Sequence, residues 1–296
     1  MEKSFLVRMF GFPATLIHGD SAVLDRWQWI KRRLPVTANG EKLLDIGCGT
    51  GAFTIGAAKR GYDALGLSWD ERNQSVARDR ARLCQANNAR FDICDVRQLD
   101  ERPEYREQFD VALCAENIEH ILDDFKLVRD VARCLKPGGR LLLTTPNFHY
   151  RAITKEDNGP FCETETGWHV RRGYTSSMLR ELCAQAGLVC ESISFCTGLL
   201  SQKATGLMRV ASRLHPWLGW GAILPLRPLI PILDPLATRC LAWPHYSICL
   251  EAYRPRRSLR PQSGQESRVE VSGLESDNGD FSDAGPAPLL AACHRG

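Results

Sequence analysis

Apolar positions along the chain alternate between short continuous runs and longer stretches in which they recur every three or four residues. The short runs predict strands at residues 42–46, 64–67, 89–94, 110–114, 141–145, 188–195 and 246–253. The longer stretches predict helices at 16–34, 52–60, 71–86, 122–135 and 176–186, the first of them with Asp20 or Ser21 as a possible cap. Strands that alternate with helices indicate an α/β fold, a doubly wound parallel sheet with helices on both faces.

The same pattern predicts how the chain is divided. We expect an N-terminal helical cap at 1–40, a sheet domain at 41–198 and an apolar insertion rich in proline and tryptophan at 199–245. The last strand of the sheet follows at 246–255. Residues 256–296 are polar and lack apolar periodicity, so they are expected to be disordered.

A glycine-rich turn follows the first predicted strand, where residues 43–51 read LLDIGCGTG. Glycines allow a sharp turn and a close approach to a ligand, and the next helix start presents free N–H groups. The turn also satisfies the looser GxGxxG/A pattern of dinucleotide sites. Asp45, just before the first glycine, favours a cationic group such as the α-ammonium of a methionine moiety and would repel a pyrophosphate.

Several motifs in the same order resemble the class I S-adenosylmethionine-dependent methyltransferases, from about Lys42 to Ala186. They are the first motif, Asp95 with Val96, the FDV that opens the fourth strand and the LKPGGR before the fifth. The resemblance implies a Rossmann-like seven-stranded sheet and S-adenosylmethionine as cofactor. The residues expected to bind it are Asp45, Gly47, Cys48, Gly49, Gly51, Ser68, Trp69, Asn73, Asp95, Val96 and Glu116.

The second predicted strand departs from this family, because Ser68 stands where an acid usually holds the ribose. Cyclopropane-fatty-acid synthases and related lipid methyltransferases also have a hydroxyl residue there. By that resemblance Ser68 and Asn73 would share the ribose. Asp70 is a competing candidate, unless it caps the next helix.

Acidic and imidazole side chains follow the fourth predicted strand. If the segment is helical, Glu116, Glu119 and His120 lie on one face and could hold a divalent cation. The spacing is similar to that of ubiquinone-biosynthesis O-methyltransferases, where the corresponding residues bind magnesium, which would lower the pKa of a substrate hydroxyl. The alternative is that these side chains only cap or pack.

His169 precedes the helix that Thr175 or Ser176 is expected to cap. Its surroundings resemble the His-x-x-x-Tyr-Thr stretch in the substrate loops of glycan, lipid and quinone methyltransferases. His120 and His169 are therefore the expected catalytic residues, with His169 as general base, unless it only orders the loop. Methyl transfer needs little more than an in-line approach.

The insertion at 199–245 favours a membrane interface, a lid over a lipophilic substrate or a cap packed on the sheet. Its prolines exclude a regular spanning helix. The residues expected to contact lipid are Trp217, Trp220, Trp243, Arg254, Arg256, Arg257 and Arg260.

Composition narrows the function classes. A net charge of +3 gives no reason to expect a nucleic-acid partner. The twelve cysteines are scattered without zinc-site spacing, and residues 1–12 have no secretory signal, so we expect reduced thiols in a cytoplasmic protein, with membrane association left open.

Together these features predict a methyltransferase that modifies an oxygen of a lipophilic, quinone-like or glycolipid substrate. Its cofactors would be S-adenosylmethionine and, if Glu116, Glu119 and His120 hold a cation, Mg²⁺. The small-molecule or lipid-linked substrate is its expected partner. The alternatives are a lipid C-methyltransferase, a nicotinamide-dependent oxidoreductase and a non-catalytic binding module.

Overall fold

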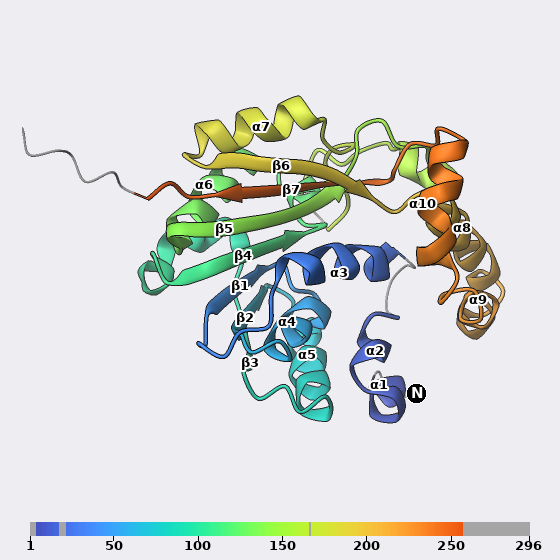
Figure 1. Ribbon diagram of the computed structural model, residues 1–296, viewed down its shortest axis with the longest axis horizontal. Helices are drawn as coiled ribbons and strands as arrows, with labels where there is room; N and C mark the ends of the chain where they lie inside the picture. The colour runs from blue at the N-terminus through green and yellow to red at the C-terminus, as the bar shows by residue number, and fades with distance from the viewer. Residues whose placement is uncertain (1–3, 18–21, 166, 257–296) are drawn as a thin grey trace, which may run out of the picture. The chain divides into compact units, whose positions relative to one another are not determined.

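A central sheet organises the computed structural model, which describes residues 4–17, 22–165 and 167–256. Its strands are β1 (Lys42–Ile46), β2 (Asp63–Ser68), β3 (Ala89–Ile93), β4 (Phe109–Ala115), β5 (Leu135–Pro146), β6 (Val189–Cys196) and β7 (Ser247–Tyr253). They form one seven-stranded sheet in the order β3-β2-β1-β4-β5-β7-β6 (Figure 1). β7 is antiparallel to β5 and β6, whereas the other strands run parallel. The predicted Rossmann-like seven-stranded fold is confirmed.

Helices cover both faces of the sheet. The α-helices of the described residues are α1 (Phe5–Phe10), α2 (Phe12–Thr15), α3 (Ala22–Arg33), α4 (Ala52–Ala58), α5 (Glu71–Leu83), α6 (Asp124–Cys134), α7 (Ser176–Gln185), α8 (Leu199–Ser212), α9 (Pro216–Ile223) and α10 (Ile230–Cys240). Neighbouring residues of β1 face opposite ways: Leu43 packs in the cluster with α3, α4 and α5, and Leu44 in the cluster with α6 and α7. Both faces are therefore buried at β1, which explains why Leu43, Leu44 and Ile46 are all apolar although they point to both sides.

The strand order reverses between β1 and β4, which lie next to each other at the centre. In open α/β sheets ligands bind outside the carboxyl ends of the strands at this point. The carboxyl end of β1 leads into the glycine-rich turn, and that of β4 leads to Glu116. We call this side of the sheet the carboxyl edge and the opposite side the amino edge.

The apolar insertion before the last strand forms α8, α9 and α10 at the carboxyl edge (Figure 1). Its two ends are joined by a backbone hydrogen bond, which Tyr246 donates to the Thr197 carbonyl over 2.9 Å. Pro231 lies in the first turn of α10, where the missing N–H costs nothing, but Pro235 lies inside the helix. Among the described residues, no helix is both long and apolar enough to cross a membrane.

The course of β7 corrects one prediction about the arginines that follow it. β7 runs from the insertion back to the amino edge, where Tyr253 pairs with Arg140 of β5. Arg254 is held there, because its guanidinium donates to the Glu107 carboxylate over 2.6 Å. Arg254 and Arg256 therefore do not adjoin the insertion, and Arg257 and Arg260 lie outside the described residues.

Some predicted boundaries were also wrong. Leu16 and Ile17 form a turn after α2, and α3 begins at Ala22; Asp20 and Ser21 lie outside the described residues. β5 begins at Leu135 rather than 141, because the KPGG segment continues as a strand beside β4. The described residues lie in one compact unit. The five-part division of the chain stays a prediction, and its tail, Arg256 apart, falls outside the described residues.

Candidate active site

The glycine-rich turn adopts left-handed backbone angles that other residues rarely take. The φ angles are +72° at Gly47, +53° at Gly49 and +80° at Gly51. A Cβ on Gly47 would lie 2.4 Å from the Asn117 amide oxygen, and one on Gly51 would lie 2.7 Å from the Phe91 ring. No atom lies within 4 Å of the Cβ position of Gly49. The turn is therefore fitted tightly to the protein at two glycines and open at the third.

Asp45 points its carboxylate toward the base of this turn from β1. It is buried, and the Thr54 hydroxyl donates to its Oδ2 over 2.6 Å. Burial raises the pKa of Asp45 to about 6, although the Thr54 hydrogen bonds act in the opposite direction. A cation placed next to this carboxylate would favour its ionised form, as the sequence-based interpretation requires.

A cavity of about 160 Å³ lies between the turn and the end of β4. It is lined by Thr15, Val23, Arg26, Asp45, Gly47, Cys48, Gly49, Thr50, Ala52, Phe53, Ala115 and Glu116. Arg26 comes from α3, and its Nη2 lies 2.9 Å from the Glu116 carboxylate. The cavity thus has an anionic side at Asp45 and a cationic group at Arg26.

A second cavity, of about 530 Å³, lies beyond the ends of β2 and β3. It is lined by Trp69, Ile93, Cys94, Asp95, Gln98, Glu101 and Arg102. The Trp69 side chain is 68% exposed. Hydrogen bonds from Arg97 lower the pKa of Asp95 and keep it ionised. Because β1, β2 and β3 are adjacent, the two cavities lie along the same edge of the sheet.

The remaining residues expected to bind the cofactor have other surroundings. The Ser68 hydroxyl accepts a hydrogen bond from the Asp70 N–H over 3.3 Å, and Asp70 caps α5 by accepting from Arg72 and Asn73. Val96 belongs to the hydrophobic core. Neither Ser68 nor Asn73 nor Val96 nor Gly51 lines the two cavities.

The sequence analysis missed Gln74. This buried side chain of α5 donates to the Asp92 carbonyl over 2.8 Å and to the Gly66 carbonyl over 3.3 Å, and it approaches the Cys48 sulfur. Its spacing to Ala77 places it on the inner face of the helix, which is the signal that could have identified it. Gln74 therefore ties α5 to the sheet and to the glycine-rich turn.

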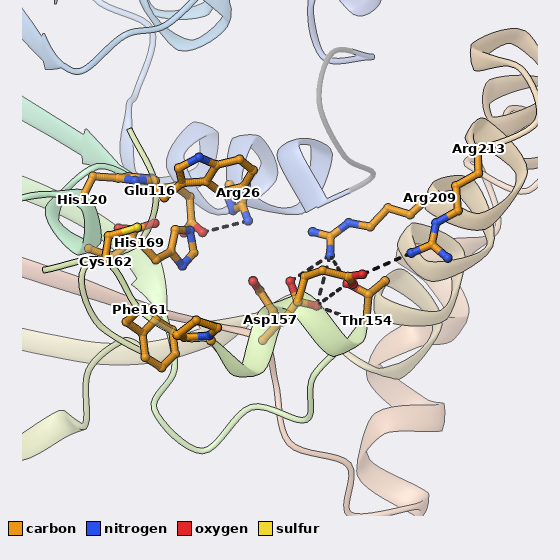
Figure 2. Close-up of a pocket in the computed structure, with 16 residues that line it drawn as sticks. Arg26, Glu116, His120, Thr154, Asp157, Phe161, Cys162, His169, Arg209 and Arg213 are labelled. Carbon is orange, nitrogen blue, oxygen red and sulfur yellow. Dashed lines mark hydrogen bonds and ion pairs between the residues drawn. The ribbon is translucent and has the colours of Figure 1, made fainter. Parts of the chain in front are cut away.

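A third cavity, of about 700 Å³, adjoins the first (Figure 2). It is lined by Arg26, Glu116, Glu119, His120, Thr154, Glu156, Asp157, Gly159, Pro160, Phe161, Cys162, Trp168, His169, Arg209, Arg213 and Tyr246. Figure 2 shows Arg209 of α8 directed at Asp157, to which it donates over 2.9 Å. Arg26 and Glu116 line both this cavity and the first one. Their ion pair therefore stands where the two spaces meet.

Two histidines and a glutamate gather at one side of the third cavity. One ligand atom from each of Glu119, His120 and His169 lies within 4.8 Å of the other two, and the centroids of the two imidazole rings are 4.7 Å apart. Glu119 accepts a hydrogen bond from the Thr145 hydroxyl over 3.0 Å, but its other oxygen and His120 Nδ1 have no hydrogen-bond partner among the described residues. A cation would satisfy both atoms.

The expected arrangement of Glu116, Glu119 and His120 on one helical face was wrong. Residues 118–120 form a single 3₁₀ turn, and Glu116 precedes it with a φ of +50°. Glu116 turns to Arg26 instead, and His169 takes the third place beside Glu119 and His120. The sequence pointed to His169 as a base, but spacing could not place it beside Glu119 and His120, because it lies in a separate loop.

Burial controls the charge of these groups. It lowers the pKa of His120, and together with His120 it lowers the pKa of His169 to about 4. Burial and the neighbouring Glu116 raise the pKa of Glu119 well above its usual value. Both imidazoles are therefore neutral at pH 7 and able to accept a proton or bind a metal ion.

Tyr174 and Thr175, at the end of the His-x-x-x-Tyr-Thr stretch, hold the loop in place. The Tyr174 hydroxyl donates to the Asp124 carboxylate over 2.7 Å, and Tyr174 is almost completely buried. Thr175 caps α7 by accepting from the Met178 N–H, as one of the two predicted caps. These contacts join the loop that carries His169 to α6 and α7.

This fold, with a carboxylate before a glycine-rich turn at the switch point, defines an α/β cofactor-binding protein. Residues 20–193 match the family model described as "Methyltransferase domain", and the chain belongs to this family of class I S-adenosylmethionine-dependent methyltransferases. The chain is 34% identical over 122 residues to the ubiquinone biosynthesis O-methyltransferase of Acinetobacter baumannii, which covers 41% of this chain and 50% of that protein. It is also 34% identical to the enzyme of the same name from Marinobacter nauticus, over 38% of this chain and 47% of the relative. The chain thus spans about half the length of the curated relatives it matches.

Solved structures share the fold at lower identity. The [4+2]-cyclase SpnF has a TM-score of 0.55 at 20% identity, over 81% of this chain and 86% of that chain. The geranyl diphosphate C-methyltransferase of Streptomyces coelicolor has a TM-score of 0.52 at 18% identity, over 77% of this chain and 76% of that chain. An S-adenosylmethionine-dependent methyltransferase from Mesorhizobium loti has a TM-score of 0.50 at 20% identity, over 77% of this chain and 97% of that chain. The names of these proteins describe different reactions, so the fold alone does not identify the acceptor.

Proposed function

We propose that this protein transfers the methyl group of S-adenosylmethionine to an oxygen of a lipophilic acceptor. Family membership and the paired charges of the first cavity support the cofactor. Asp45 faces one side of that cavity and suits the α-ammonium group, whereas Arg26 suits the α-carboxylate. Trp69 and Asp95 border the second cavity, which suits the adenosine. The donor would then lie along the carboxyl edge, with its methyl group toward the third cavity.

The meeting of the first and third cavities at the Arg26–Glu116 pair is the observation that carries the proposal. An acceptor in the third cavity can approach the sulfonium in line, which supplies most of what methyl transfer requires. Phe161, Trp168 and Tyr246 line this cavity and suit a lipophilic body. The neutral His169 and His120 can accept the hydroxyl proton as the oxygen attacks.

A divalent cation remains part of the proposal. Glu119, His120 and His169 are the residues that would hold it, and the two unpartnered atoms among them fit a cation. Two imidazoles and one carboxylate favour a transition metal over Mg²⁺, whose preferred ligands are oxygens. When bound, such a cation would lower the pKa of an acceptor hydroxyl.

The test of this function begins with calorimetric titration of S-adenosylmethionine, with NADH as the competing ligand. A methyl-labelled donor is then incubated with extracted lipids and quinones, and labelled products are identified by mass spectrometry. Binding of the donor and label on an ether or ester oxygen are expected. Binding of NADH in its place would favour the oxidoreductase, and binding without any labelled product would favour the non-catalytic module.

Carbon methylation of a lipid is the second candidate. It is supported by Ser68, which stands in place of the ribose-binding acid at the end of β2, and by the fold shared with a geranyl diphosphate C-methyltransferase. Label that survives ether-cleaving acid and appears on a carbon in the NMR spectrum would favour it over oxygen methylation.

A further inference from the structure

Exposed aliphatic side chains gather at the end of α9, in the connection and on one face of α10. We call Leu224, Leu226, Leu229, Ile232, Leu233 and Leu236 the aliphatic surface. Ile232 is 72% exposed, Leu236 65% and Leu229 53%. On α10 these residues recur at three- and four-residue spacing, opposite the buried Asp234 and Thr238. A stretch of this kind usually marks a contact site.

The fold holds this surface in place. The Asp234 carboxylate accepts from the N–H groups of Gly198 and Leu200 over 2.9 and 2.6 Å, and Thr238 accepts from Leu199 over 2.8 Å. These bonds fix the buried side of α10 to the start of α8. The leucines and Ile232 on the other side are consequently kept turned outward.

The exposed charges that the insertion itself carries are all basic. Asp234 is the only acid between residues 199 and 245, and it is buried in the contacts just described. The exposed basic groups are Lys203 on α8, which lies over the Trp243 ring, Arg213 just after α8, which pairs with Glu156 over 3.4 Å, and Arg239 on the outer face of α10. Such a combination of outward aliphatic groups and basic groups complements anionic phospholipid headgroups over an apolar interior.

The tryptophans predicted to anchor this segment turn out to have other contacts. Trp220 packs with Met208 and Ile223 in a small core of the insertion. Trp243 donates its indole N–H to Gln202 over 3.0 Å and lies under the Arg151 guanidinium. The side chain of Trp217 is outside what the structure describes. The outward side chains of the aliphatic surface are therefore leucine and isoleucine, which the aromatic composition did not suggest.

The insertion also forms a wall of the third cavity. Arg209 and Arg213, from the end of α8, line that cavity, and α8 packs against both α9 and α10. A bilayer in contact with the aliphatic surface would therefore lie beside the helices that enclose the acceptor space.

We infer that the aliphatic surface rests on an anionic phospholipid bilayer, so that a lipophilic acceptor reaches the third cavity from the lipid. The second part of this inference depends on the proposed function, whereas the binding to the bilayer does not. The two parts are measured separately, by vesicle binding without donor or acceptor and by methyl transfer to acceptor in detergent.

The binding test is flotation of the full chain with vesicles of phosphatidylcholine containing 30% phosphatidylglycerol, compared with phosphatidylcholine alone. We expect the bound fraction to rise with phosphatidylglycerol and to fall between about 0.05 and 0.5 M salt. A triple variant, Leu229→Ser, Ile232→Ser and Leu236→Ser, should lower the partition coefficient about tenfold or more even at low salt. Arg239→Glu should weaken binding only to the anionic vesicles.

Matched controls remove exposed groups elsewhere. The triple variant Val36→Ser, Met178→Ser and Val189→Ser takes away exposed apolar side chains outside the insertion, and Arg32→Glu reverses an exposed charge at the end of α3. Both should bind vesicles like the parent. Circular dichroism and cofactor affinity establish that each variant is folded.

Two outcomes would overturn the inference. One is a wild-type protein that stays unbound with anionic vesicles at low salt. The other is a dimer in light scattering that the aliphatic variant converts to a monomer, which would assign the surface to a second copy of this chain. Vesicle binding without methyl transfer would leave the bilayer contact standing and count against the proposed function alone.

Discussion

The buried carboxylate of Asp45 leads to a prediction about cofactor affinity. The Thr54 hydroxyl donates to this carboxylate, but burial still disfavours its negative charge. A cationic ligand beside it would therefore stabilise the ionised form strongly. Replacing Asp45 with Asn keeps the size and the hydrogen bond but removes the charge. We expect the Kd for S-adenosylmethionine, measured by calorimetry, to rise about 30-fold or more.

The matched control is Asp63→Asn. Asp63 lies at the start of β2, at the amino edge, in an exposed ion pair with Arg90. Its removal should leave the affinity unchanged. Equal affinity of the Asp45 variant and the parent would contradict the assignment of Asp45 to the ammonium group.

Cofactor affinity should also depend on pH through Asp45. Its pKa is raised to about 6 in the empty site, so the protein must give up a proton to bind a cation at lower pH. Affinity is therefore full above pH 7 and should fall about tenfold by pH 5. The Asp45→Asn variant should lack this dependence, and a parent with flat affinity between pH 7.5 and 5 would exclude Asp45 as the titrating group.

Two roles of His169, accepting a proton and binding a metal ion, can be distinguished by experiment. With a pKa near 4, its imidazole is neutral from pH 5 to 8, so kcat should show no inflection from His169 in that range. His169→Gln should lower kcat about 100-fold and leave the KM for the donor nearly unchanged. The exposed His149→Gln is the control. If EDTA reproduces the loss in the parent and has no further effect on the variant, His169 acts as a metal ligand and not as a base.

The sequence could predict candidate site residues where they lie together in one strand or turn. The sequence around Asp45 and the glycines determines its own geometry, so the first cavity could be anticipated. Arg26, His169 and Arg209 come from three separate segments, and only packing brings them to Glu116, Glu119 and Asp157. Sequence spacing contains no information about such encounters.

At the scale of elements, apolar runs predicted the central strands because burial on both faces leaves little room for polar residues, whereas the outer strands β3 and β6 are more exposed and more polar. Helix ends were less certain, since capping and turn geometry decide them locally. The insertion shows the limit most clearly. Its prolines suggested a broken segment, yet Pro231 lies in a helix first turn and the buried Asp234 caps α8 from α10.

The contact between α8 and α10 gives an element-scale prediction. Asp234→Ala leaves three N–H or O–H donors without their carboxylate, from Gly198, Leu200 and Thr238. The free energy of unfolding should fall by about 2–4 kcal/mol, and proteolysis should begin within 199–245. Thermal denaturation and the masses of early fragments are the measurements.

An ordinary helix cap is the matched control for that change. Asp123→Ala removes the cap that accepts from the Lys126 N–H at the start of α6. It should cost about 1 kcal/mol and create no early cleavage in the insertion. Equal effects of the two substitutions would show that Asp234 has no special role in holding the insertion.

At the scale of the whole molecule, the cavities share the carboxyl edge, so ligand binding should stabilise the entire compact unit. S-adenosylhomocysteine at 100 times its Kd should stabilise the folded state by about 2.7 kcal/mol, which raises Tm by about 5–10 °C. NADH at the same concentration should cause no shift. A comparable shift with NADH would contradict the methionine-specific interpretation of the site.

The backbone hydrogen bond between Thr197 and Tyr246 has a consequence for how this fold can diversify. The bond closes the insertion at its base, and the pairing of β6 with β7 begins directly beside it. Lengthening a closed loop costs little entropy, so the segment between these two residues can be exchanged or shortened without altering the sheet register. A related protein could therefore carry a different segment between these two residues, and so a different wall of the third cavity, while the glycine-rich turn and the sheet stayed the same.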